Sequence, residues 1–338
     1  MNNISEFINN SFIGNLVKNP QITDISYNGK DIFYVDNLYG RQKFDSEVTN
    51  KEVVDFLRQI SNLTNTPFSI KDPILDVSFD NYRLNASFYT LSHKNKEEVV
   101  TFALRIFSKK IKITENSGFF PKKLDKIFKF FMAKKMSFII AGLPSSGKSE
   151  FQKYLLNSMH SNERVMVIDT IDELDIDYNP NLDISLFLAD EKVYSDMVSL
   201  LKLSLRYDPD YVVIAEARGS EFEEILTSSL SGIPTITTIH AKSIDQIVER
   251  CINMVQINNK NLGYNIIKDS ILDHFDVLVY IEKNFDKNGE VVRKIKDVSI
   301  IYKKKQYKIY EFREKDIFYP FPEEFIYENK DYENILRS

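Results

Sequence analysis

The feature that most constrains this chain is the segment from Gly142 to Ser149, which reads Gly-Leu-Pro-Ser-Ser-Gly-Lys-Ser. It fits the pattern of a glycine, four residues of any type and then Gly-Lys-Ser. An apolar run, Ser137 to Ala141, leads into it, and a stretch with one apolar face, Glu150 to Met159, follows. Strand, glycine-rich loop and helix in this order are the setting in which the pattern binds phosphate. A chance match in a turn is the alternative, and the flanking strand and helix argue against it.

Each residue type in this phosphate loop has a chemical reason. Glycines let the backbone curl so that successive amide groups face phosphate oxygens, and the following helix adds its positive end. Lys148 is expected to reach the β- and γ-phosphates, and the Ser149 hydroxyl to bind Mg²⁺. The sequence therefore predicts a nucleotide site. The residues assigned to nucleotide binding are Gly142, Ser145, Ser146, Gly147, Lys148 and Ser149.

Carboxylates follow two further predicted strands. The strand Val165 to Ile168 is followed by Asp169 and, a little later, by Glu173. The strand Tyr211 to Ala215 is followed by Glu216. A nucleotide site needs one carboxylate for the water shell of the metal and another to orient the attacking water. Each acid alone would be read as a solvated strand cap, but their position after a phosphate loop in one sheet favours catalysis, with Glu216 also assigned to Mg²⁺.

Two other chemically distinctive residues are His240 and Cys251. His240 ends the predicted strand Thr235 to Ile239, so it should emerge at the same sheet edge as the acids. A lone histidine is more often structural than functional, but its place at this edge assigns His240 to the catalytic residues together with Asp169, Glu173 and Glu216. Cys251 is the single cysteine, so neither an internal disulfide nor a multi-thiolate metal site is available, which fits a reducing cytoplasm. On the apolar face of a predicted helix, it is most simply a small core residue.

The pattern of apolar residues changes near Pro121. Before it, short strands from Ile22 to Tyr39 and a helix from Thr49 to Leu63 predict an α+β domain. After it, strands and helices alternate, which predicts a parallel-dominated sheet covered on both faces. The lysine-rich stretch Lys109 to Ser117 is a linker or a surface loop within one domain. The expected α/β chain thus has an N-terminal domain at 1–108, a linker at 109–120 and a C-terminal domain at 121–338.

Composition limits the partners of the chain. The formal net charge of -5 argues against a protein whose main role is to coat nucleic acid. No apolar run approaches the roughly 20 residues that span a bilayer, so we expect no transmembrane segment and only peripheral membrane contact.

Two longer segments resemble a known family. Asp208 to Glu221 and Thr237 to Ala241 resemble the Walker B and histidine boxes of the type II/type IV secretion traffic ATPases. Val165 to Leu174 resembles the aspartate box of this family, and Arg250 stands where the family has an arginine after the histidine box. Two shorter segments, Pro73 to Ala86 with Arg83 and Asn85, and Ala103 to Arg105, are similar to the part that precedes the motor domain in the type IV secretion branch.

Departures from the family pattern are equally specific. Ala215 replaces the usual glycine before Glu216, and Ile233 stands where the family commonly has a histidine. The aspartate box normally opens Glu-Asp, whereas this chain has Asp169 and, further on, Glu173, so either acid is a candidate general base. The four-cysteine zinc element of the type II secretion and pilus-assembly motors is absent, which favours the type IV secretion branch.

The resemblance implies a function. It implies a RecA-like motor that hydrolyses ATP with Mg²⁺ and assembles as a homohexamer, with Arg83 and Arg105 reaching the phosphates from the N-terminal domain. It further implies a cytoplasmic protein that docks on inner-membrane secretion-complex proteins and moves protein or DNA substrates in type IV secretion or conjugation. The alternatives are a type IV pilus or tight-adherence pilus motor, a DNA translocase, and a structural subunit that binds ATP without turnover.

Overall fold

The computed structural model divides into two compact units, Met1–Lys109 with Phe285–Val292 and Lys110–Asn284 with Arg293–Ser338. Each unit is described by itself. The residues described are 2–88, 99–114, 117–174, 182–190, 196–219, 221–229, 231–259 and 261–336. Part of the stretch predicted to be a linker, residues 115 and 116, lies outside them.

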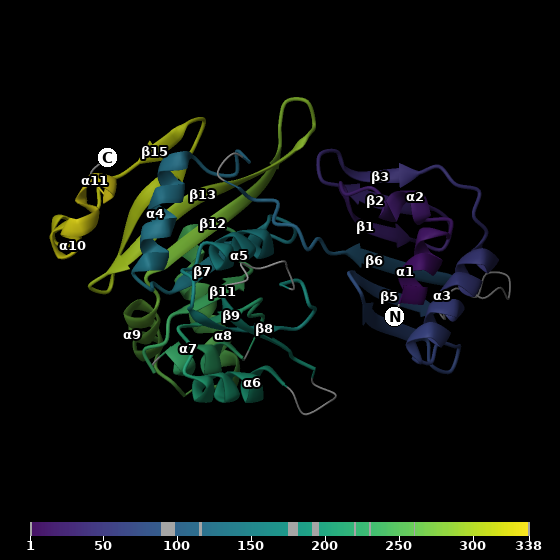
Figure 1. Ribbon diagram of the computed structural model, residues 1–338, viewed down its shortest axis with the longest axis horizontal. Coiled ribbons are helices and arrows are strands. Elements are labelled where there is room, and N and C mark those ends of the chain that lie inside the picture. Colours follow the sequence, from purple (N-terminus) through teal and green to yellow (C-terminus); the bar gives the residue numbers. More distant parts are fainter. Residues whose placement is uncertain are drawn as a thin grey trace. The chain divides into compact units, whose positions relative to one another are not determined.

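The first unit is an antiparallel sheet with helices on one face (Figure 1). Its strand order is β3-β2-β1-β6-β5-β4. The strands are β1 Ile22–Tyr27, β2 Ile32–Asp36, β3 Gly40–Phe44, β4 Ile74–Phe79, β5 Tyr82–Phe88 and β6 Val100–Ile106. The helices are α1 Asn2–Asn9, α2 Gly14–Val17 and α3 Asn50–Thr64.

Helix α3 begins at a capping box and packs its apolar side on this sheet. The Thr49 hydroxyl accepts the Glu52 N–H, and the Glu52 carboxylate accepts the Thr49 N–H at 2.8 Å. This reciprocal pair satisfies two amide groups that a helix start leaves without partners. Val53, Leu57 and Ile60 are fully buried in one core with the alternate residues of the strands. Successive side chains of a strand point to opposite faces, so the polar residues that alternate with the buried ones in each strand lie on the other face of the sheet.

The second unit contains a mixed nine-stranded sheet in the order β15-β14-β13-β12-β7-β11-β10-β8-β9. From β12 to β9 all neighbouring strands are parallel, whereas β13, β14 and β15 pair in antiparallel fashion. The chain is thus an α/β protein. The strands are β7 Phe138–Gly142, β8 Arg164–Asp169, β9 Asp183–Leu188, β10 Tyr211–Ile214, β11 Thr235–Ile239, β12 Val277–Phe285, β13 Val291–Tyr302, β14 Lys305–Phe312 and β15 Asp316–Phe318.

Helices cover both faces of the second sheet, so its central strands β7, β11 and β10 are buried along their whole length. Phe138 and Ile140 of β7 belong to the core on one face, and Ile139 and Ala141 to the core on the other. The first core includes α4, α5, α10 and α11, and the second includes α6, α7, α8 and α9 (Figure 1). The helices are α4 Lys122–Ala133, α5 Lys148–Asn157, α6 Met197–Ser204, α7 Phe222–Ser229, α8 Ile247–Asn258, α9 Tyr264–His274, α10 Glu323–Glu328 and α11 Glu333–Leu336.

Several elements differ from their sequence prediction. Helix α5 begins at Lys148, inside the predicted phosphate loop, and ends before Met159. Strand β9 had no predicted counterpart, because its residues are mostly half-buried or exposed at the sheet edge and show no clear apolar alternation. The aromatic segment from Tyr307 forms most of β14, in which Tyr310 is buried, and then β15, and no strand was predicted for it.

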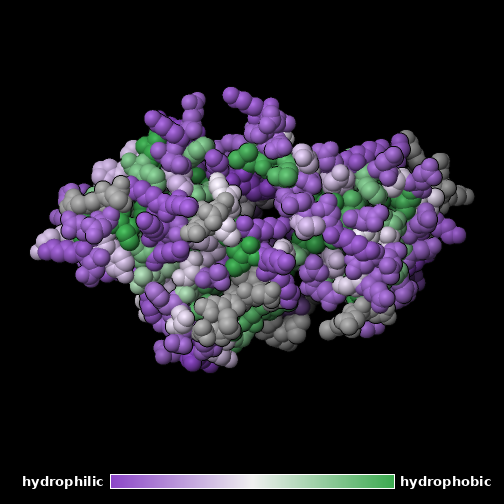
Figure 2. All heavy atoms as spheres, turned by 45° about the horizontal axis from the view of Figure 1, so that its top comes forward, coloured by the Kyte–Doolittle hydropathy of each residue, from purple (hydrophilic) through white to green (hydrophobic). Residues whose placement is uncertain are grey.

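Hydrophilic residues predominate on the face seen in Figure 2, with smaller apolar areas between them. Among the described residues, no helix is both long enough and apolar enough to cross a bilayer.

Candidate phosphate-binding site

Sheet topology brings the predicted site residues to one edge. Strands β7, β11, β10 and β8 are consecutive neighbours and all parallel. Their carboxyl ends therefore lie at the same edge of the sheet, where ligands bind in open α/β sheets. Gly142 ends β7, His240 follows β11, Glu216 follows β10 by two positions, and Asp169 ends β8.

Two glycines of the phosphate loop are required by its geometry. A Cβ on Gly142 would lie 2.6 Å from the Ile281 carbonyl oxygen of β12, closer than such atoms approach. Gly147 has φ of 104°, a left-handed conformation that L side chains rarely adopt, and it is the N-cap residue of α5. Ser145 is also left-handed, with φ of 60°. The loop therefore bends sharply over a few residues, as a backbone that wraps phosphate must.

Lys148 links the loop to His240. Its ammonium Nζ lies 3.2 Å from the Gly142 carbonyl oxygen, 3.3 Å from the Leu143 carbonyl oxygen and 3.2 Å from His240 Nδ1. His240 Nδ1 also lies 3.2 Å from the Gly142 carbonyl oxygen, so it accepts from Lys148 in one protonation state of the ring and donates to Gly142 in another. The other ring nitrogen, Nε2, faces the Glu216 Oε1 atom at 2.6 Å, a short contact without hydrogen-bond geometry. Lys148, His240 and Glu216 thus form a continuous polar chain across the ends of β7, β11 and β10.

Arg218 contacts the other oxygen of Glu216. Its Nε and Nη2 atoms lie 2.9 and 2.8 Å from Glu216 Oε2. The Glu216 side chain lies between the Arg218 guanidinium and the His240 imidazole. It is only 18% exposed, so the site is largely shielded from solvent. Sequence reasoning gave Arg218 no role, although it lies within the Walker B resemblance. The neighbouring Ser220 of that segment lies outside the described residues.

The two acids of the aspartate box have different surroundings. The Ser149 hydroxyl donates to Glu173 Oε2 at 2.7 Å. Asp169 is fully buried, and its carboxylate accepts backbone N–H groups of the following turn, from Thr170 at 2.7 Å and Leu174 at 2.9 Å. Asp169 therefore shapes the turn, and Glu173 is the acid that this turn brings to the phosphate loop.

The donors at this edge fit a nucleotide with Mg²⁺. Within the described part of the chain, the buried Ser146 hydroxyl and the Glu216 Oε1 atom have no hydrogen-bond partner. Ser149 and Glu216 offer hard oxygen atoms, which Mg²⁺ prefers. The described residues contain no cluster of His, Cys, Asp or Glu side chains that would hold a metal alone. A metal here would thus share its coordination with substrate phosphates and water, the usual arrangement for Mg²⁺.

Arg83 and Arg105 lie in the first unit, directly opposite each other on β5 and β6. Arg83 contacts Asp76 at 3.4 Å, and Arg105 contacts Asp24 at 3.1 Å. The structure thus brings the two arginines together on the polar face of one sheet. Their reach toward phosphates stays a prediction.

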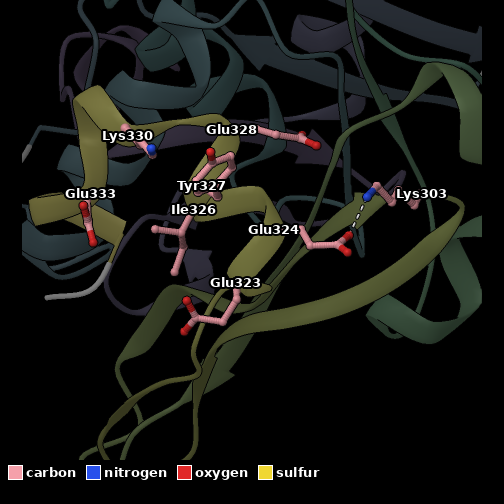
Figure 3. A pocket seen from close by; sticks show the side chains of 8 residues that line it. All are labelled: Lys303, Glu323, Glu324, Ile326, Tyr327, Glu328, Lys330 and Glu333. Atoms are coloured by element: carbon pink, nitrogen blue, oxygen red, sulfur yellow. Dashed lines mark hydrogen bonds and ion pairs between the residues drawn. The ribbon is translucent and has the colours of Figure 1, made fainter.

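A separate pocket of about 540 Å³ lies near the C-terminal helices (Figure 3). Lys303 forms an ion pair with Glu324 at its rim. No residue of the phosphate loop lines this pocket, so it is not the predicted nucleotide site. Its lining residues are Lys303, Glu323, Glu324, Ile326, Tyr327, Glu328, Lys330 and Glu333.

The site lies within a segment that matches a known protein family. The family "Type II/IV secretion system protein" matches residues 74–272. An uncharacterized Bacillus anthracis protein is 25% identical over 86% of this chain and 67% of its own length. The type IV secretion system protein VirB11 of Brucella suis is 30% identical, over 42% of each chain. Competence protein ComGA of Streptococcus pneumoniae is 35% identical over 35% of this chain and 36% of its own length. The chain therefore matches well under half of VirB11 and ComGA.

Solved structures agree with the fold. The Legionella pneumophila ATPase DotB superposes with a TM-score of 0.60 at 16% identity, covering 83% of this chain and 78% of DotB. The pilus retraction motor PilT, solved with bound ADP, gives a TM-score of 0.53 at 14% identity, covering 93% of this chain and 84% of PilT. The fold is thus that of secretion and pilus motor proteins. Because the family match spans more than half of the sequence, this chain belongs to the type II/IV secretion system protein family, and VirB-type proteins are among its relatives.

Proposed function

We propose that this chain is a Mg²⁺-dependent ATPase that powers type IV secretion or conjugative transfer. The observation that carries the proposal is the polar chain from Lys148 through His240 to Glu216 at the mouth of the phosphate loop. An ammonium and a carboxylate at this edge match the two charges that phosphoryl transfer requires, one for the phosphates and one for the metal.

Each residue of the site has a proposed role. Lys148 would bind the β- and γ-phosphates, and Ser149 and Glu216 would hold Mg²⁺, which supplies charge neutralisation at the phosphates. Glu173, already hydrogen-bonded to Ser149, is our choice for the acid that orients the attacking water. His240 would fix the direction of the Glu216 carboxylate, and Asp169 would hold the turn that carries Glu173.

We propose that the chain has an N-terminal domain at 1–108, a linker at 109–120 and a RecA-like motor domain at 121–338. We propose that it forms a homohexamer on the cytoplasmic face of the membrane, where it contacts inner-membrane secretion-complex proteins and moves protein or DNA. The match to VirB11, a type IV secretion system protein, supports this assignment.

A pilus motor is the second candidate. It is favoured by the superposition on PilT over 93% of this chain and by the match to ComGA. A translocase that threads DNA directly is disfavoured by the net charge of -5. A structural subunit that binds ATP without turnover would keep the phosphate loop and lack hydrolysis, so a rate measurement separates it from both motors.

The test is phosphate release from ATP by the purified full chain, with particle mass measured with and without ATP. We expect turnover by the parent and near-complete loss in Lys148→Ala, because the proposal assigns binding of the β- and γ-phosphates to this ammonium. Lys202→Ala, on exposed surface of the same unit, is the matched control and should retain activity. Parental turnover in Lys148→Ala would show that the loop is not the phosphate site, and a parent that binds but never hydrolyses ATP would favour the structural subunit.

A further inference from the structure

Arg293 joins the phosphate loop from the far end of the sequence. It lies near the start of β13, and its Nε atom donates to the Ser145 carbonyl oxygen at 2.9 Å, across a sequence separation of 148. Ser145 is the left-handed residue of the loop, with φ of 60°. A non-glycine residue in this conformation costs on the order of 1 kcal/mol, so the surrounding contacts must hold it there.

The contact with Arg293 fixes one peptide plane of the loop from its carbonyl side. The next amide, Ser146 N–H, donates to the Leu143 carbonyl oxygen at 3.2 Å. A peptide group is planar, so holding its oxygen and its N–H together sets the orientation of the whole unit. The chain leaves this plane directly into Gly147 and Lys148. Their direction at the start of α5 therefore depends on the Ser145–Ser146 peptide.

Arg293 also brings charge and packing to the loop. Its Cδ atom lies 3.9 Å from the point that a Cβ on Gly147 would occupy, and the Phe119 ring lies 3.3 Å from that point. Burial lowers the pKa of the Arg293 guanidinium, which stays a cation. Burial likewise lowers the pKa of Lys112, and the neighbouring cations Lys153 and Arg293 lower it further, although Glu150 opposes them. Positive charge thus gathers beside the loop.

We propose that Arg293 is a positioning residue of the phosphate loop. It holds the Ser145–Ser146 peptide in the orientation that phosphate binding needs, and its charge favours a polyphosphate nearby. The proposal rests on the nucleotide-binding part of the proposed function. It assigns a role to a residue outside every motif in the sequence, on a strand that follows the last of them.

Two substitutions separate the hydrogen bond from the charge. Arg293→Met keeps an unbranched apolar side chain as far as the position of Nε but removes both the donor and the charge. Arg293→Gln is neutral, and its amide nitrogen occupies the same position along the side chain as the arginine Nε, so it can still donate to Ser145. Arg313→Met is the matched control, since Arg313 lies in the same unit and contacts Glu311 on an exposed surface, away from the loop.

Two measurements are made on each full-length variant. Hydrogen exchange of peptides covering residues 142–147 is recorded without nucleotide, and the Kd for fluorescent ADP is titrated. We expect Arg293→Met to exchange faster in the loop and to bind ADP about tenfold more weakly, the effect of losing one charge-assisted hydrogen bond. We expect Arg293→Gln to keep parental exchange while binding ADP a few-fold more weakly. In turnover assays KM should rise more than kcat falls, because the loop acts on binding.

Arg293→Met with parental loop exchange and an ADP Kd within about twofold of the parent would overturn the proposal. Equal losses in Arg313→Met would overturn it as well, since they would mark a general effect of removing surface arginines. If Arg293→Met does not fold, the test rests on Arg293→Gln. Parental ADP affinity in that variant would show that the charge of Arg293 does not contribute to binding, which would contradict the proposal. A parent that fails to bind ADP would instead refute the proposed function. The exchange data would still show whether Arg293 stabilises the conformation of the loop.

Discussion

Glu216 has each of its carboxylate oxygens beside a different basic side chain. His240 Nε2 lies 2.6 Å from Oε1, and Arg218 contacts Oε2 through two nitrogen atoms. The two hydrogen bonds from Arg218 are charge-assisted and hold Oε2, whereas Oε1 is buried against His240 without a hydrogen bond from the described residues. At the scale of single residues, the site is therefore built around one acid whose orientation is set by its neighbours, and whose charge is what a metal would require.

Glu216→Gln tests the assignment of this acid to the metal. The amide keeps the shape of the side chain but loses the charge that organises the metal and its water. We expect ATP binding within a few-fold of the parent and hydrolysis reduced by at least about 10², a loss in kcat rather than in affinity. Filter binding of labelled ATP and single-turnover hydrolysis measure the two effects. Parallel loss of binding and turnover would indicate a role in folding instead.

At the scale of elements, the arginine pair on β5 and β6 stands out. Like charges directly opposite on neighbouring antiparallel strands destabilise a sheet unless other groups compensate. Asp76 and Asp24 lie beside Arg83 and Arg105, respectively, and supply that compensation. An arginine pair kept on the polar face of a sheet, with partial exposure, suits a surface that binds anions.

The element-scale prediction is that Arg83→Ala or Arg105→Ala lowers kcat by roughly 10³, the loss expected when an arginine finger is removed, with a much smaller change in ATP affinity. A contact between these arginines and the phosphates would also couple ATP binding to domain closure. The small-angle scattering profile of each variant should therefore not change on adding ATP. Arg41→Ala, on β3 of the same sheet, is the control and should behave like the parent. Folded, assembled variants with parental kcat would place nucleotide handling in the C-terminal domain alone.

At the scale of the whole molecule, Asp276 makes stability depend on pH. Its carboxylate accepts the Ser137 N–H at 2.7 Å at the end of the sheet where β7 begins, away from the phosphate loop. Burial raises the pKa of Asp276 to about 6 from 3.8, against the opposing effects of the Ser137 hydrogen bond and of His274. The folded state therefore holds this proton more tightly than the unfolded chain does. The contribution of Asp276 to the free energy of unfolding falls as the pH rises from 3.8 to about 6 and is constant above that range.

Asp276→Asn removes this titration while an amide oxygen can still accept the Ser137 N–H. We expect the variant to gain stability relative to the parent across the same pH range, by up to about 3 kcal/mol. Urea unfolding of both proteins at pH 4, 5, 6 and 7 measures the difference, and the comparison cancels the titration of all other groups. A difference that does not vary with pH would show that Asp276 keeps an ordinary pKa.

The sequence by itself determined the family and the phosphate loop, because both depend on residues that are close along the chain. A strand, a glycine-rich turn and a helix start form from local preferences, and Gly142 to Ser149 carries all of their signals. The carboxyl ends of the parallel strands also followed from the sequence, since a buried apolar run ends where a polar residue begins. Strand β9 and strands β14 and β15 could not be predicted from the sequence. Their residues show no clear local pattern, and they form strands because they pair with neighbouring strands of the sheet.

Only the tertiary structure decided which side chains meet at that edge. The sequence left Asp169 and Glu173 as equal candidates, and the turn after β8 gives the first to backbone amides and the second to Ser149. The contact of Arg293 with the loop spans 148 positions and has no motif. Contacts of this kind depend on sheet order and on side-chain reach, which are properties of the packed chain rather than of any segment of its sequence.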